Sequence, residues 1–103
     1  MITGKLSNGF EVTVDETKIK TYRFTKIIGM AASQKEKERI YANAIFLSFL
    51  IGEEQEEKLL EHMYNDLGRE AEADEVTNIT MEILNLAKQE DEQIKKSASS
   101  DES

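Results

Sequence analysis

The sequence has no cysteine, no proline and no tryptophan, and it contains a single histidine among 103 residues. Without cysteine, a disulfide framework, a thiolate zinc site and a cysteine nucleophile are all excluded. Without proline, no candidate helix is interrupted by a residue that lacks a backbone N–H donor. We therefore expect a small domain held together by packing and hydrogen bonds, with no cofactor and no metal.

Long apolar runs are also missing. The longest run, within residues 45–51, falls far short of the roughly 20 residues that a membrane-spanning helix needs. The first ten residues lack the basic start and apolar block that are typical of a signal peptide. These absences predict no membrane association, and the lack of cysteine fits a cytosolic location.

Positive charge is scarce, because 13 Lys and Arg face 21 Asp and Glu, which gives a formal net charge of -8. This balance argues against nucleic acid as a partner, since phosphate contacts need clustered basic side chains. One basic cluster exists at Lys35, Lys37 and Arg39, but Glu36 and Glu38 alternate with it. Such mixing is typical of a solvated helix face.

The pattern along the chain predicts a mainly α fold: about four helices with a short N-terminal β-hairpin, forming one domain over residues 1–89. Short β-prone runs at Ile2–Leu6 and Phe10–Val14 flank Asn8-Gly9, a pair that favours a tight turn. We thus expect a hairpin over residues 1–14. Residues 90–103 are polar and serine-rich, and we expect them to form a flexible tail.

Start and stop signals divide the remainder into helices. Asp15 is suited to cap a first helix over Thr17–Ala32, although the Thr and Ile content there also permits a strand. Ser33 and Glu36 have capping-box spacing and predict a second helix to about Ile51. The later expected boundaries are a stop at Gly52, a third helix from Glu53 to the stop at Gly68, and a fourth helix over Glu72–Gln89.

We find no catalytic constellation and expect no enzyme. The glycines form no phosphate-binding pattern, and the acidic runs lack EF-hand spacing. His62 stands one turn before Asp66 on an expected helix, but two ligands are too few for a structural zinc site. A surface or helix-boundary role is the favoured interpretation of His62.

The positive signal is the excess of apolar residues in the second helix. At about 100° per residue they cover roughly 240° of its circumference, whereas a helix packed on one side needs little more than about 100°. Either this helix is central and covered all round, or part of it contacts another protein chain. The candidate protein-binding residues on the second and third helices are Phe46, Phe49, Leu50, Leu60 and Met63.

The sequence resembles the tail assembly chaperones of long-tailed bacteriophages, in the short form found in phages of Gram-positive hosts. Matching elements are a hairpin at Lys5–Glu16, a Leu-Ile-Gly-Glu-Glu-Gln element within Leu50–Met63, Gly68, and Asn78–Leu84. The glycine–glutamate–glutamine part is the most specific, and none of these motifs is catalytic. The chain departs from the family at Thr17–Met30, which is basic and β-branched where members often have an acidic, Leu- and Ala-rich helix.

The resemblance implies a non-enzymatic role in viral tail assembly. Such proteins bind the tape-measure protein, keep it soluble, help to recruit tail-tube subunits, and are absent from the mature virion. It implies the cytoplasm of the infected bacterium as the location, a homo-oligomer, and contact with the tube protein mainly through a longer form made by ribosomal frameshifting. A-rich codons at Lys95-Lys96 would suit such a shift, as a hypothesis for the nucleotide sequence to test.

An acidic protein-binding inhibitor or adaptor, of the antitoxin or DNA-mimic kind, is the alternative. That class would show a long face of patterned carboxylates with few lysines. In this chain the acids are mixed with basic residues, and the densest acidic cluster stands in the opening turns of the third helix, where it favours helix initiation.

Overall fold

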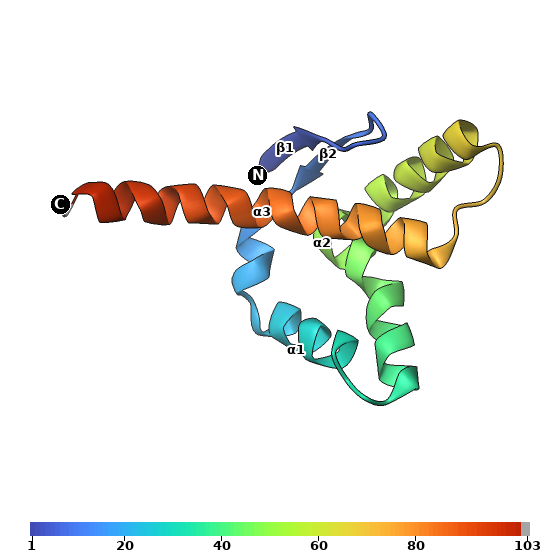
Figure 1. Cartoon of the computed structure of the whole chain (residues 1–103), viewed down its shortest axis with the longest axis horizontal. Coiled ribbons are helices and arrows are strands. Elements are labelled where there is room, and N and C mark those ends of the chain that lie inside the picture. Colours follow the sequence, from blue (N-terminus) through green and yellow to red (C-terminus); the bar gives the residue numbers. More distant parts are fainter. Residues whose placement is uncertain (102–103) are drawn as a thin grey trace.

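The computed structural model describes the backbone of residues 1–101 and the side chains of residues 1–89. Two strands are followed by a short 3-10 helix and three α-helices in this part of the chain. Figure 1 shows the hairpin above the long last helix, α3 (Ala73–Asp101), with α1 (Tyr22–Ala31) and the start of α2 (Glu36–Leu67) below it. The predicted mainly α fold with an N-terminal hairpin is confirmed, with the correction that two expected helices form one kinked element.

The hairpin pairs β1 (Ile2–Lys5) with β2 (Glu11–Val14) in antiparallel register. The N–H of Gly9 donates to the Leu6 carbonyl and the N–H of Leu6 donates to the Phe10 carbonyl, each at 2.9 Å, and Gly9 has φ 87°. This geometry is a three-residue loop that needs a left-handed glycine. As the alternation predicts, Val12 and Val14 are buried while Glu11 is exposed.

The segment expected as one helix over Thr17–Ala32 is divided. A 3-10 helix, η1 (Glu16–Lys20), comes first, and α1 (Tyr22–Ala31) follows. Asp15 caps η1 as expected by accepting from the Thr17 N–H at 3.0 Å. Thr21 then adopts an extended conformation and accepts from the Phe24 N–H at 3.2 Å, so that it caps α1. The single-helix prediction was wrong because a threonine hydroxyl competes locally for the backbone donors.

Helix α2 (Glu36–Leu67) contains the two central helices that the sequence predicted. The capping box at Ser33 is not formed, because Lys35 is the N-cap and Ser33 Oγ accepts from the Lys35 N–H at 3.1 Å. Gly52 has φ 83° and ψ 159°, which breaks the helical path. The predicted interruption is therefore confirmed, and its conformation differs from the left-handed helical one that is usual for a glycine at a helix end. We call residues 36–51 and 53–67 the first and second halves of α2.

Lys18 provides a hydrogen-bond donor for a backbone carbonyl at the C-terminal end of the first half of α2. Its Nζ donates to the Phe49 carbonyl at 2.9 Å and lies 5.7 Å from the centre of the Phe49 ring. A helix carries partial negative charge at its C-terminal carbonyls, and a lysine placed there is stabilising. The kink at Gly52 is thus supported from a segment more than thirty residues away, since the bond spans 31 positions.

Helix α3 spans Ala73–Asp101 and continues past the end predicted at Gln89. The turn before it begins at Gly68, which ends α2 in the left-handed conformation as predicted. Arg69 and Glu75 bridge this turn at 2.7 Å, and a Glu75 oxygen also accepts from the Glu72 N–H at 2.9 Å. Side chains of the expected tail, residues 90–103, lie outside the described residues, so its flexibility stays a prediction.

The hairpin is fastened to α2 by Gln55. The Thr13 N–H donates to Gln55 Oε1 at 2.9 Å, and Gln55 Nε2 donates to the Thr13 carbonyl at 2.7 Å. Thr3 stands opposite Thr13 in the register, and their hydroxyls lie 3.0 Å apart. In an antiparallel pair the backbone groups of a position that is not bonded across the ladder point outward. The glutamine amide therefore makes the two hydrogen bonds that a third strand would make to Thr13.

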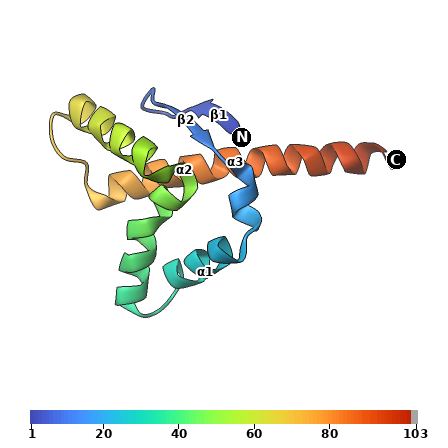
Figure 2. The same ribbon diagram turned by 180° about the vertical axis from the view of Figure 1, so that it is seen from behind.

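The turn of the hairpin has two further attachments, one to α2 and one to α3. His62 Nε2 donates to the Asn8 carbonyl at 2.9 Å. The N–H and hydroxyl of Ser7 donate to the Glu82 carboxylate at 2.9 and 2.6 Å. Figure 2 shows the hairpin lying over the second half of α2 and the middle of α3. The hairpin, this half of α2 and α3 thus form one body.

The core lies where this body meets the first half of α2. Leu50, Leu59, Ile83 and Leu84 are the largest fully buried side chains besides the two valines of β2. Helix α1 packs on the first half of α2, where the Phe24 and Phe46 rings meet edge to face at 6.1 Å. Helix α3 faces this pair of helices, and a groove remains between α3 and the pair.

Candidate functional site

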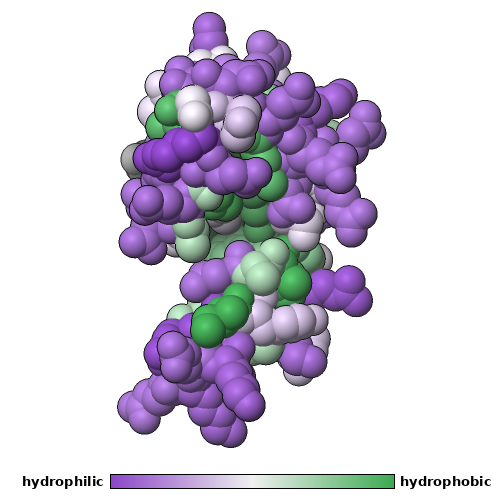
Figure 3. Space-filling view, turned by 90° about the vertical axis from the view of Figure 1, so that its right-hand side faces the viewer, coloured by the Kyte–Doolittle hydropathy of each residue, from purple (hydrophilic) through white to green (hydrophobic). Residues whose placement is uncertain are grey.

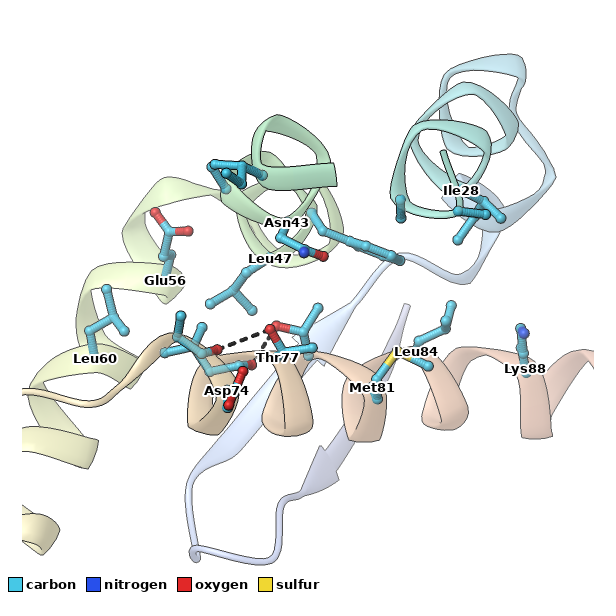
Figure 4. A pocket seen from close by; sticks show the side chains of 18 residues that line it. Ile28, Asn43, Leu47, Glu56, Leu60, Asp74, Thr77, Met81, Leu84 and Lys88 are labelled. Atoms are coloured by element: carbon cyan, nitrogen blue, oxygen red, sulfur yellow. Dashed lines mark hydrogen bonds between the residues drawn. The ribbon is translucent and has the colours of Figure 1, made fainter. Parts of the chain in front are cut away.

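An apolar groove of about 750 Å³ runs between α3 and the pair formed by α1 and the first half of α2. Figure 4 shows α3 along one wall, with α1 and α2 above it. The second half of α2 closes one end, because the kink at Gly52 turns that half toward the start of α3. The lining residues are Ile28, Ala31, Ala32, Ile40, Asn43, Ala44, Phe46, Leu47, Glu56, Leu60, Ala73, Asp74, Val76, Thr77, Thr80, Met81, Leu84 and Lys88.

The floor of the groove is part of the core, and its rim is apolar but exposed. Phe46, Leu47 and Leu84 are buried at its base. Large apolar side chains around the rim remain in contact with solvent: Ile40 is 60% exposed, Met81 44%, Leu60 38% and Ile28 37%. Figure 3 shows apolar side chains reaching the surface at the waist of the molecule, between two largely hydrophilic parts. An exposed apolar surface with a polar border is typical of a protein-binding site.

Polar side chains on the α3 wall do not make the groove polar. The hydroxyls of Thr77 and Thr80 donate to the carbonyls of Ala73 and Val76 at 2.9 and 2.8 Å, bonds within the helix itself (Figure 4). A hydroxyl satisfied in this way has no donor left to offer a ligand. The wall thus presents mainly methyl groups and the Met81 thioether, which suit an apolar partner.

The charged side chains of the groove are separated by sign. Glu56 and Asp74 lie toward one end, and Lys88 lies at the other (Figure 4). Burial raises the pKa of the Glu56 carboxyl, and the charges of Glu53 and Glu57 raise it further. Among the described residues, Glu56 has no ion-pair partner that would offset these effects.

The structure brings together only part of the predicted binding set. Phe46 and Leu60 both line the groove. Leu50 and Met63 are core residues, 1% and 5% exposed. Phe49 is half-buried against Lys18, away from the groove. No measurement bears on binding by any of the five, so their role stays a prediction, with Phe46 and Leu60 placed to contact a partner directly.

Two rim residues were missed by the sequence reasoning: Ile28 and Ile40. Ile40 had a signal, because Ile40, Ala44 and Leu47 follow the i, i+4, i+7 spacing of one helix face. Ile28 and Met81 belong to α1 and α3, and only the tertiary arrangement brings them to the same groove as α2.

A second, smaller cleft of about 230 Å³ lies between the hairpin turn, the end of α2 and the start of α3. It is acidic, but Glu75 is paired with Arg69 and Glu82 holds Ser7. His62 bonds to the hairpin turn, as a histidine with a structural role does. Within residues 1–89, whose side chains are described, no three His, Cys, Asp or Glu residues are placed to hold a metal.

Comparisons with family models, curated proteins and solved structures find no match to this chain. No helix in the described part of the chain has a stretch long and apolar enough to cross a bilayer.

Proposed function

We propose that this protein is a bacteriophage tail assembly chaperone that binds the tape-measure protein, keeps it soluble and helps to recruit tail-tube subunits. The observation that carries the proposal is the open apolar groove with Ile40, Met81, Leu60 and Ile28 on its rim. A long helical client exposes an apolar stripe before it is packaged, and a groove of this kind covers such a stripe. The role needs binding and release, and no catalytic chemistry.

The size of the groove supports a helical client. From Asp74 to Lys88 the α3 wall covers 15 residues, and the 14 steps between them at 1.5 Å each give about 21 Å, or roughly four helical turns. A volume of about 750 Å³ is comparable to that of a small-molecule pocket and far below that of a whole helix. The groove therefore suits the side chains of one stripe and leaves the rest of the client outside.

The most specific element of the family resemblance supports the same proposal. In the segment Gly52-Glu53-Glu54-Gln55, the glycine makes the kink of α2 and the glutamine holds the hairpin. The kink shapes the groove, because it brings Glu56 and Leu60 of the second half toward the start of α3. This motif, which contains no catalytic residue, thus has a structural role in the fold.

The proposed partners are the tape-measure protein, other copies of this chain in a homo-oligomer, and the tail-tube protein, mainly through a frameshifted longer form. The proposed location is the cytoplasm of the infected bacterium, with the protein absent from the mature virion. Repeated copies along a long client would gain affinity by avidity.

The alternative role as an acidic inhibitor has less support. Such a protein needs carboxylates that are free to face a basic partner. Several acids are engaged within this chain: Glu54 with Lys58 at 3.4 Å, Glu75 with Arg69, and Glu82 with Ser7. The apolar groove would also have no purpose in that role.

Co-expression with the tape-measure protein of the same phage tests the proposal. The expected result is that the client becomes soluble only with this chain and co-purifies with it. A client that stays insoluble and unbound would favour the acidic-inhibitor alternative. Expression of an unrelated acidic helical protein of similar size in place of this chain controls for nonspecific solubilisation.

A further inference from the structure

The separation of charge along the groove has a consequence for how a helix lies in it. A helix carries about half a positive charge at its N-terminus and half a negative charge at its C-terminus. Glu56 and Asp74 lie toward the end where α3 begins, and Lys88 lies toward the other end (Figure 4). The two ends of a bound helix would therefore meet charges of opposite sign.

We infer that the groove holds one amphipathic helix of the client parallel to α3, with the N-terminus of that helix beside Glu56 and Asp74 and its C-terminus beside Lys88. This inference rests on the proposed function and adds the direction in which the client is held. A fixed direction would give successive copies of the chaperone a common orientation along a long client.

Glu56 favours this direction most strongly. It is half-buried in the groove wall, Glu53 and Glu57 repel it, and no described residue neutralises it. A positive helix end placed next to it would relieve that repulsion in a site partly shielded from water. Asp74 lies in the first turn of α3 and adds to the negative charge of this end.

The dipole of α3 disfavours a bound helix that runs parallel to it, but its partial charge is smaller than the charges of Glu56 and Asp74. Its N-terminus contributes about half a positive charge near Asp74. Glu56 and Asp74 contribute two full negative charges, so the net field at this end remains negative. At the far end, Lys88 is exposed and favours the C-terminal carbonyls of the bound helix.

The direction is measurable with a designed peptide. The probe is an 18-residue peptide with leucines at i, i+3, i+4 and i+7 spacing, blocked ends and no charge in its terminal turns, so that only the dipole distinguishes its ends. Because the chain has no cysteine, a single nitroxide label is introduced cleanly at Glu72→Cys or Gln89→Cys. Both positions are exposed and neither lines the groove.

We expect the label at position 72 to broaden the amide signals of the first turn of the peptide, and the label at position 89 to broaden those of the last turn. The reverse pattern, or equal broadening at both ends, would overturn the inferred direction and leave the proposed chaperone function standing. Failure of the peptide to bind would also overturn the inference, while the co-expression experiment decides the chaperone function independently.

Charge variants provide a second readout. Glu56→Gln, Asp74→Asn and Lys88→Gln should each weaken peptide binding by about 2- to 5-fold at low salt. Glu61→Gln, an exposed position on the same half of α2 and outside the groove, is the matched control and should leave affinity unchanged. Equal affinity for all four variants would contradict the role of these charges. If sedimentation shows that the free protein self-associates and Ile40→Ser abolishes that association, a second copy fills the groove, an outcome that would likewise overturn the inference.

Discussion

At the scale of single residues, Gln55 shows how a side chain joins distant parts of this chain. Its amide pairs with both backbone groups of Thr13, 42 positions away, and also donates to the Ile51 carbonyl at 2.8 Å. Only a side chain with both a donor and an acceptor makes this pair of bonds. Glutamate at this position would lack the donor, which accounts for a glutamine following two glutamates.

Gln55→Leu should destabilise the fold by about 1–3 kcal/mol, because it leaves the half-buried Thr13 N–H and carbonyl without partners. Urea unfolding measures the loss. Glu61→Leu, on the exposed face of the same half of α2, is the control and should change stability by less than about 0.5 kcal/mol. Equal effects of the two variants would show that the hairpin is not held by this amide.

Gly4 of β1 packs closely against Leu86 of α3. A Cβ atom at this position would lie 2.9 Å from Leu86 Cδ1. Gly4→Val should therefore cost about 1–3 kcal/mol through overpacking. Leu86→Ala in the same chain should recover part of that loss, and a double-mutant cycle measures the coupling. A cycle with no coupling would contradict the contact.

Glu56 gives a dependence of stability on pH. Its pKa is raised in the folded protein, chiefly by burial, so the folded state binds the proton more tightly than the unfolded chain. Its contribution to stability is therefore fully present below the ordinary value of 4.5 and is lost as pH rises through the raised pKa.

We expect Glu56→Gln to stabilise the protein at pH 7 by no more than about 0.5 kcal/mol, because the side chain is partly solvated. This gain should shrink as pH falls toward 4. Urea unfolding of the unmodified protein and of Glu56→Gln at pH 7 and pH 4 measures this gain in stability, with Glu61→Gln as the control. A destabilised variant at pH 7 would show that the charge of Glu56 is compensated within the fold.

At the scale of elements, the kink of α2 decides whether a groove exists. A straight helix over Glu36–Leu67 would carry Leu60 away from the start of α3. Gly52 permits the kink because its φ of 83° and ψ of 159° are open almost only to glycine.

Gly52→Ala should cost about 1–3 kcal/mol, the usual range for a strained backbone position. Gly29 provides a matched control, since it lies exposed within α1 with nothing within 4 Å of an added Cβ and without a positive φ. Gly29→Ala should stabilise by about 0.5–1 kcal/mol through helix propensity. Thermal unfolding of both variants measures the contrast, and the same sign for both would contradict the assigned role of Gly52.

The elements also show what the sequence allows one to predict. The hairpin, the interruption at Gly52 and the stop at Gly68 were predictable because glycine and Asn-Gly signals act locally. The division at Thr21 and the unused capping box at Ser33 were not, since several hydroxyls compete for the same backbone donors.

The length of α3 was also missed, because the apolar pattern fades before the helix ends. The candidate site was predictable only in part. Phe46 and Leu60 belong to the predicted apolar surface of α2, but α1 and α3 supply the facing walls of the groove. Such contacts between distant elements leave no local pattern for a sequence argument to detect.

At the scale of the whole molecule, one part of the protein holds the hairpin, the second half of α2 and α3, and the other holds α1 and the first half of α2. The groove lies where they meet. The proposed chaperone role and the inferred direction of the client both depend on this junction remaining open to a helix.

The most direct test compares two adjacent and similarly exposed side chains on α2. Ile40 is 60% exposed and lines the groove, whereas Tyr41 is 56% exposed and does not. The measurement is calorimetric titration of the soluble tape-measure segment into Ile40→Ser and Tyr41→Ser. If the groove is the client-binding surface, Ile40→Ser should weaken binding by at least about 5-fold, and Tyr41→Ser should leave it unchanged. Equal affinity of the two variants for the client would contradict the account.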